Sequence, residues 1–518
     1  MLSCKRGDSP KKVMGTSRTI LAIFLVAIVP TGSFAAKVHL VVTQPTSPDP
    51  LSCRVYLVDR EGKAVLPTAF LSWRDHFVFA GDGQFDLPAG DYGITIERGP
   101  EFTRTTGALR IGQEQLVKAK FEIHRIVNLA DEGWWSGEIH VHRSPSDIEL
   151  LMRAEDLHIA PVITWWNSND IWRNHAFPTK LTVGFDSNRF YNLMAGEDER
   201  AGGALLYFGL QRPLPIANAG AEYPPSLQFL ALARRQPGTW VDIEKPFWYD
   251  VPVWLASGMV DSIEIANNHM MHSQVMDGEA WGRERDRRRF PPSNGNGLWT
   301  QEIYYQILNC GLRIPPSAGS ASGVLTNPLG YNRAYVHLDG ALSYDAWWNG
   351  LRAGCVFVTN GPLLRVSADS QWPGHVFKGR SGETMTLDLD ASLDSRDPIA
   401  RIDVVKNGAI ERTISRSEWI RAHSLGQISF SESGWFLVRV ISDVPETFRF
   451  ASTAPFYVEM GEGRRRQSRS SAQFFLGWVR ERSSRIHLAD PTQQAEALRC
   501  QADAERFWER KVQDSNAD

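Results

Sequence analysis

The sequence lacks three features that would assign it to a well-marked class of protein. It has no surplus of positive charge, because 56 basic and 59 acidic side chains give a formal net charge of −3. Its 5 cysteines are scattered rather than placed at metal-finger spacing. No apolar run after the N-terminal one is long enough for a membrane helix. We therefore expect no nucleic-acid partner and no stable membrane span in the mature chain.

The N-terminus has the pattern of an export signal. Basic residues from Lys5 to Arg18 precede the apolar run Ile20–Val29, and the small-residue segment Ser33–Ala35 follows it. This order is typical of a cleaved signal peptide, and the apolar run is too short to span a bilayer comfortably as an anchor. We predict that residues 1–35 are removed, which leaves a periplasmic or secreted protein of net charge about −7. The pairing of its remaining cysteines stays open.

Two regions of alternating apolar residues and tight turns predict small β-sandwiches. In residues 36–127, strand-like runs are separated by turn signals such as Glu61-Gly62 and Gly81–Gly83. This region resembles the regulatory-type sandwich found beside carboxypeptidases and other secreted enzyme domains. In residues 366–460, Asn407-Gly408 is a strong hairpin signal.

The region between the two sandwiches has a different pattern. In residues 128–365, short apolar runs end in polar or aromatic clusters, and segments with helical periodicity such as Asp147–Leu157 and Thr300–Cys310 lie between them. Strands that alternate with helices are typical of an α/β barrel, whose active face collects the C-terminal ends of the strands. Residues 461–518 predict a linker and a helical tail, whose last helix begins at Asp490-Pro491 and docks on the body.

The stretch Trp134–His142 carries the most informative chemistry. Alternation along a strand would place Glu138, His140 and His142 on one face, and two imidazoles on one face are a ready pair of metal ligands. The alternative is a half-exposed strand that holds no metal. In a barrel, three polar residues at later strand ends would converge on this pair: Glu197, Glu244 and His269.

Several stretches together point to a family: Trp135–His142, Gly196-Glu197, Gly319–Gly323, Pro328–Arg333 and Val356–Pro362. They resemble motifs of the polymerase-and-histidinol-phosphatase (PHP) superfamily, and more narrowly those of its exported, carbaryl-hydrolase-like branch. The resemblance implies an α/β fold, with a distorted (β/α)7 barrel flanked here by the two sandwiches and the helical tail. It also implies a metal site of His, Asp and Glu ligands that hydrolyses phosphate or carboxylic esters.

The sequence departs from this family at several ligand positions. Thr164–Asn167 reads Thr-Trp-Trp-Asn where the family usually has Thr-Asp-His-Asn, and Gly319–Gly323 reads Gly-Ser-Ala-Ser-Gly where it usually has Gly-Ser-Asp-Ser-His. Trp165, Trp166, Ala321 and Gly323 cannot replace those ligands. The resemblance therefore implies a reduced site with one divalent metal, Zn or Mn.

The candidate residues fall into three groups. The candidate metal ligands are His140, His142, Glu197, Glu244 and His269. The candidates for a general base, or for a carboxylate that orients an imidazole, are Glu138, Asp198 and Glu199. The candidate substrate-binding residues are Arg143, Trp165, Trp166, Lys245 and Arg333. For the charged residues the alternative is an ordinary ion pair, and for the tryptophans it is a place in the core.

Two functions follow from this reading. The first is an exported metal-dependent hydrolase that uses metal-activated water against an ester or phosphoester of a small-molecule substrate. The second is a catalytically inactive barrel that binds a carbohydrate or glycoconjugate, with tryptophans stacking on sugar rings in place of the lost ligands. The two functions would be distinguished by whether Glu197, Glu244 and His269 lie within metal-binding distance of the two histidines.

Overall fold

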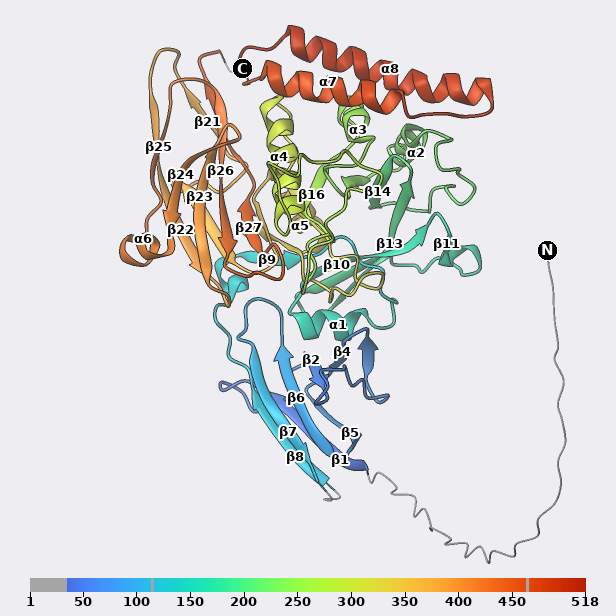
Figure 1. The fold of residues 1–518 in the computed structure, drawn as a ribbon, viewed down its shortest axis with the longest axis vertical. Helices are drawn as coiled ribbons and strands as arrows, with labels where there is room; N and C mark the ends of the chain where they lie inside the picture. The colour runs from blue at the N-terminus through green and yellow to red at the C-terminus, as the bar shows by residue number, and fades with distance from the viewer. Residues whose placement is uncertain (1–34, 113–115, 463–464) are drawn as a thin grey trace, which may run out of the picture.

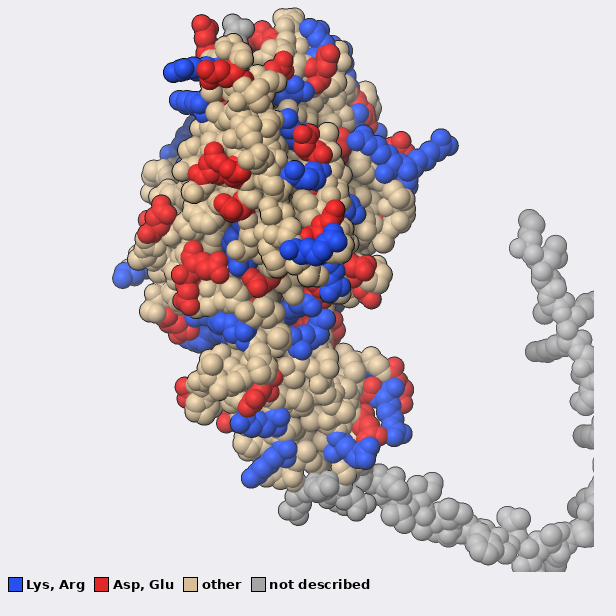
Figure 2. Space-filling view, turned by 90° about the vertical axis from the view of Figure 1, so that its left-hand side faces the viewer, with Lys and Arg blue, Asp and Glu red and all other residues tan. Residues whose placement is uncertain are grey.

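The computed structural model describes residues 35–112, 116–462 and 465–518. Apart from Ala35, the predicted signal peptide lies outside these residues. In Figure 1 the N-terminal sandwich lies at one end, the central strands and helices lie above it, the second sandwich lies beside them and a pair of helices crosses the far end. In Figure 2 a narrow neck separates the N-terminal sandwich from the rest, and acidic and basic side chains are interspersed over this face.

The N-terminal sandwich consists of two sheets around one core. The first sheet has the order β5-β1-β8, with β1 Ala35–Thr43, β5 Asp82–Pro88 and β8 Leu116–Glu122. The second has the order β3-β4-β2-β6-β7, with β2 Cys53–Val58, β3 Leu71–Trp73, β4 His76–Phe79, β6 Gly90–Glu97 and β7 Thr105–Ile111. Alternate residues such as Val38 and Leu40 point inward and bury an apolar core of their own.

The central region combines short strands with helices. Its strands are β9 Trp134–Gly137, β10 Ile159–Trp166, β11 Asn169–Asp170, β12 Thr182–Phe185, β13 Arg189–Arg200, β14 Gly203–Phe208, β15 Trp240–Ile243, β16 Ser262–Ala266, β17 Pro316–Ala318, β18 Arg333–His337 and β19 Val356–Thr359. Its helices are η1 Leu129–Glu132, α1 Ile148–Glu155, η2 Ile171–Arg173, α2 Ser226–Ala233, α3 Val251–Ser257, α4 Gly295–Asn309 and α5 Tyr344–Ala353. The strands β14, β15, β16, β17 and β19 are buried along their whole length, which is why they read as largely apolar runs.

The expectation of a distorted (β/α)7 barrel is wrong. The structure is rich in sheet, with 38% strand and 21% helix. β13 turns directly into β14, which pairs antiparallel with β13 and β15, and β18 pairs antiparallel with β9 and β19. In the central region, the strands that pair in parallel are β9–β10–β13 and β15–β16–β17. The prediction failed because a short buried apolar run looks the same whether a helix or a hairpin follows it.

The second sandwich continues the central sheet. One layer has the order β20-β22-β25, with β20 Leu363–Ala368, β22 Met385–Asp394 and β25 Gly426–Phe430. The other layer contains β21 Val376–Gly379, β23 Ile399–Lys406, β24 Ala409–Ser415, β26 Gly434–Ser442, β27 Phe450–Thr453 and β28 Phe456–Met460, and helix α6 Arg416–Ala422 follows β24. β27 pairs antiparallel with β19 of the central region. The predicted hairpin at Asn407-Gly408 is confirmed, because both residues have positive φ and join β23 to β24.

The helical tail packs on the central region as the sequence predicts. Helices α7 Arg469–Ser483 and α8 Pro491–Gln513 lie side by side (Figure 1). The Asp490 side chain accepts hydrogen bonds from the backbone of the first turn of α8 and caps this helix. The Trp508 indole donates to the Pro252 carbonyl of α3 at 3.0 Å. Among the described residues, no helix has the length and apolar character needed to cross a membrane.

Candidate metal centre

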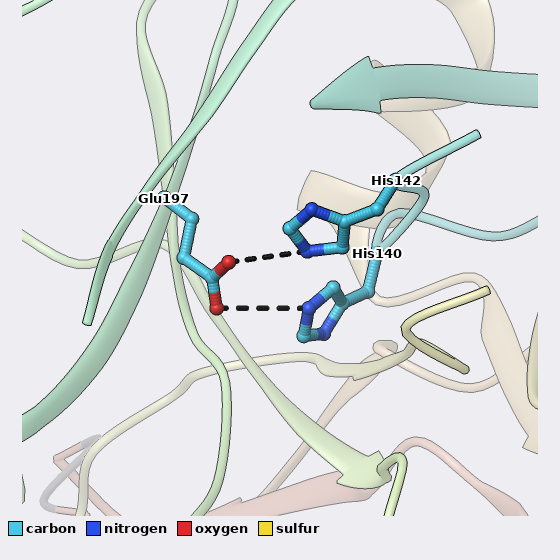
Figure 3. Close-up of side chains that lie close together, drawn as sticks. All are labelled: His140, His142 and Glu197. Atoms are coloured by element: carbon cyan, nitrogen blue, oxygen red, sulfur yellow. Dashed lines mark ion pairs between the residues drawn. The ribbon is translucent and has the colours of Figure 1, made fainter. Parts of the chain in front are cut away.

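His140 and His142 lie just beyond the end of β9. The predicted strand through His142 ends at Gly137, but backbone hydrogen bonds hold the following residues extended. The Ile139 amide donates to the Ala318 carbonyl at 3.2 Å, and the His142 amide donates to the Ser322 carbonyl at 2.8 Å. The alternation is thus preserved, and both imidazoles face Glu197 of β13 (Figure 3).

These three side chains form a compact group of potential ligands. His142 Nε2 lies 3.1 Å from Glu197 Oε2, and His140 Nε2 lies 3.7 Å from Glu197 Oε1 (Figure 3). One ligand atom from each residue lies within 4.8 Å of the others, so the group could hold a metal ion. Burial raises the pKa of Glu197, but the His142 and His140 imidazoles outweigh it and lower this pKa to about 2. The two imidazoles thus favour the ionised form of Glu197, which is the form that binds a metal.

Two further carboxylates lie on the other side of the His140 ring. Glu244 Oε1 and Glu264 Oε2 are each 3.6 Å from His140 Nδ1. Glu264 is fully buried, and within the described chain neither of its oxygens has a hydrogen-bond partner. Burial, reinforced by the nearby Glu244, raises its pKa well above the usual value.

Glu264 is the site residue that the sequence analysis missed. It lies in the middle of β16, where every residue is buried. A carboxylate inside an apolar strand is costly unless it is paired or binds a cation. That cost is the signal that could have identified it.

Glu244 is held by three donors. Its carboxylate accepts hydrogen bonds from the Lys245 ammonium, from Asn268 Nδ2 at 3.0 Å and from Trp248 Nε1 at 3.0 Å. The Lys245 ammonium also lies 4.5 Å from the centre of a Trp248 ring. Lys245, predicted to bind substrate, is therefore engaged with Glu244 and Trp248.

The group opens onto a cavity of about 420 Å³. Its polar side contains His140, His142, Glu197, Glu244 and Lys245. Its other walls are aromatic and apolar: Trp166, Trp248, Trp281, Met276, Val324 and Leu325. Such a mixture is typical of a small-molecule site, in which apolar walls hold the ligand and a few polar groups orient it.

Three other predicted residues also line this cavity. Glu199 lines the cavity, and its side chain is partly open to solvent. Partial loss of solvation there and the charges of Glu244 and Glu197 raise its pKa to about 7. The Trp166 ring meets the His142 ring edge to face at 5.4 Å. His269 Nδ1 lies 3.0 Å from the Met276 carbonyl, but His269 is not part of the group within 4.8 Å. Burial lowers the pKa of His269 to about 3.

The two other carboxylates predicted for catalysis do not line the cavity. Glu138 accepts hydrogen bonds from the backbone amides of Ser320, at 2.6 Å, and Gly330, so it anchors the loop between β17 and β18. Asp198 binds the Arg200 guanidinium, with both oxygen–nitrogen distances at 2.8 Å. Alternation along β13 turns Asp198 away from the side that Glu197 faces.

Three predicted substrate-binding residues also lie elsewhere. The Arg143 guanidinium stacks on the Trp73 ring of the N-terminal sandwich at 4.8 Å. Trp165 is buried at 1% exposure and stacks on Tyr207. The Arg333 side chain donates to the carbonyls of Gly330 and Glu155 inside the protein. The prediction that both Trp165 and Trp166 line the pocket is thus correct for Trp166 alone.

Comparisons with known proteins leave the function open. No family model and no curated protein matches the chain. Fibronectin(III)-like modules of Clostridium thermocellum CbhA match 18% of this chain and 94% of theirs at 16% identity and a TM-score of 0.14. The N-terminal four Ig domains of Dscam1 isoform 7.44 match 83% of this chain and 73% of theirs at 8% identity and a TM-score of 0.14. Bacteroides uniformis β-glucuronidase 3 matches 79% of this chain and 60% of its own at 10% identity and a TM-score of 0.14. Likenesses this weak carry no argument about function.

Proposed function

We propose that the protein is an exported metal-dependent hydrolase of ester or phosphoester bonds, centred on His140, His142 and Glu197. The observation that supports this is the buried group of two imidazoles and one carboxylate beside a cavity of small-molecule size. The donor set suits one Zn²⁺ or Mn²⁺ ion, and a bound cation would favour the ionised form of the nearby Glu264, whose oxygens have no hydrogen-bond partner among the described residues. The resemblance to the PHP superfamily supports the same chemistry.

The residues around the group suit hydrolysis. A bound divalent ion would supply Lewis acidity, which polarises a substrate oxygen and lowers the pKa of water. Glu199, with a pKa of about 7, is suited to exchange a proton with the reacting groups near neutral pH. Trp166 and Trp248 form an apolar wall that can exclude water and hold a flat part of the substrate.

A second candidate is carbohydrate or glycoconjugate binding. The observation that favours it is Trp281, which lines the cavity at 52% exposure and stacks with Trp248 at a centroid distance of 6.3 Å. An exposed indole beside a cavity is suited to stack on the apolar face of a sugar ring.

Elemental analysis of the purified protein tests the proposal. The protein and its His140→Ala/His142→Ala variant are prepared in parallel with Zn²⁺ and Mn²⁺ supplied. We expect about one equivalent of metal in the protein and almost none in the variant, together with metal-dependent turnover of chromogenic esters or phosphoesters. Absence of metal from both proteins would rule out the hydrolase. Glycan binding, with Trp166→Ala and Trp281→Ala as first variants, would then be examined.

A further inference from the structure

Four carboxyl groups lie at the cavity or beside it. Glu197, Glu244 and Glu264 surround His140, and Glu199 lies close by. Against these, Lys245 is the one Lys or Arg side chain that lines the cavity in the described part of the chain. The position of this ammonium therefore decides how many metal ions the site can take.

Lys245 is held at the acidic side of the cavity and is not free to reach a substrate. Its side chain is 4% exposed, and its ammonium binds Glu244 Oε1, the same oxygen that lies 3.6 Å from His140 Nδ1. The Trp248 ring lies 4.5 Å from the ammonium, and the Trp248 indole N–H donates to the other Glu244 oxygen. The lysine, the tryptophan and the carboxylate thus fix one another.

A second cation position would lie beside this ammonium. His140 Nδ1 has no hydrogen-bond partner in the described structure, and it faces Glu244 and Glu264 at equal distances. Both Glu264 oxygens are buried and unpartnered as well. The carboxyl groups of Glu244 and Glu264 are a plausible set of donors for a divalent ion. A neighbouring ammonium opposes a second ion there, because like charges at this separation repel strongly inside a protein.

We propose that Lys245 is a built-in cation that takes the place of a second metal ion, so that the cavity binds one divalent ion and not two. The proposal rests on the proposed metal-dependent function and specifies its metal count. Lys245 acts here as a positioning residue, because it neutralises Glu244 and leaves His140, His142 and Glu197 to bind the metal.

Equilibrium dialysis against Mn²⁺, followed by elemental analysis, tests the metal count. We expect one equivalent in the wild-type protein even at saturating Mn²⁺. We expect two in Lys245→Ala, because the charge is gone and the space is open. The matched control Lys245→Arg keeps the charge and should stay at one. In the double variant Lys245→Ala/Glu264→Gln the second equivalent should be lost again.

The outcomes separate this inference from the proposed function. No bound Mn²⁺ or Zn²⁺ in the wild-type protein contradicts the metal-dependent function itself. Two equivalents in the wild-type protein, or one in a folded Lys245→Ala protein, overturn the role of Lys245 alone. Circular dichroism checks the fold of each variant. If Lys245→Ala does not fold, Lys245→Gln keeps a hydrogen-bond donor for Glu244 without the charge and should take up the second ion.

Discussion

The interface between the N-terminal sandwich and α1 buries charge in pairs, whereas the cavity beside β9 buries carboxylates in excess. At the interface, Arg54 of β2 binds Glu97 of β6 and Glu155 of α1. Asp156 accepts from Arg98 at 2.9 Å and from Arg125 at 2.8 Å. Beside the cavity, Glu264 has no hydrogen-bond partner in the part of the chain that the structure describes, and it faces His140 Nδ1 at 3.6 Å.

The difference separates buried charges that are paired within the protein from a buried carboxyl group that could be compensated by a ligand. A buried ion whose partners lie within the protein contributes to the native contacts of that protein. A buried ion without a partner costs free energy unless something from outside compensates it. Changes in the two places should therefore affect stability with opposite signs.

The largest expected effect comes from breaking the paired network. Arg54→Met leaves Glu155 buried without its ion-pair partner, so we expect the free energy of unfolding to fall by about 3–5 kcal/mol. Urea unfolding measures this. The double variant Arg54→Met/Glu155→Gln should recover about 1 kcal/mol or more of the loss. Equal stability of the single variant and the wild-type protein would show that the ion-pair network does not stabilise the interface.

Breaking the ligand group should affect activity far more than stability. His142→Ala removes one donor of the metal, and we expect kcat/KM on a chromogenic ester to fall about 100- to 1000-fold, which is ~3–4 kcal/mol. The control Trp165→Phe changes a large ring outside the cavity and should leave kcat/KM within about threefold. A His142→Ala protein with unchanged, metal-dependent turnover would disprove the assignment.

Removing the unpaired carboxylate should stabilise the metal-free protein. Because burial raises the Glu264 pKa, the folded protein must protonate this group or bury its charge at pH values where the unfolded chain is ionised, and either costs stability. Glu264→Gln removes that cost, and we expect a gain of about 1–3 kcal/mol in urea unfolding without metal. In the same variant the affinity for Mn²⁺ should fall about 10- to 100-fold. A loss of stability in the metal-free variant would contradict this account of Glu264.

The smallest effect is a pH dependence at the network. Burial lowers the pKa of His158, next to Asp156, to about 3. The unfolded chain therefore takes up a proton near pH 6.5 that the folded protein excludes, and stability falls as the pH drops below this value. At pH 5.5 the loss should be about 1.4 kcal/mol relative to neutral pH. His158→Gln should flatten this part of the pH profile, and an unchanged slope in that variant would assign the effect to other groups.

The sequence predicts the centre of the candidate site better than its surroundings. His140, His142 and Glu197 could be identified because a short motif places two imidazoles on one side, and Glu197 ends a strand-like run. Glu264 could not, since an acidic residue inside an apolar strand carries no motif. Arg143 and Arg333 were wrongly predicted to bind substrate, because the sequence shows a charged side chain but not the group that it contacts. Arg143 stacks on Trp73, and Arg333 donates to the Glu155 carbonyl, and both of these contacts join residues far apart along the chain.

The fold was likewise predicted in part: local features followed from the sequence, but the pairing of the strands did not. Alternation and turn residues predicted local features such as the Asn407-Gly408 hairpin. The pairing of β18 with β9 depends on contacts between distant residues. The hairpin of β13 and β14 is local, but hydrophobic periodicity does not report strand direction.

The packing of Trp165 against Gly196 restricts how this site could change by mutation. A Cβ atom on Gly196 would overlap the Trp165 indole, so the large ring and the missing side chain depend on each other. A single substitution of Trp165 by a small acidic residue would leave a void and a buried charge together. Residues on both strands would have to change before a metal ligand could be tolerated at this position. A chain that carries this pair therefore cannot gain a carboxylate at Trp165 in one step without a loss of stability.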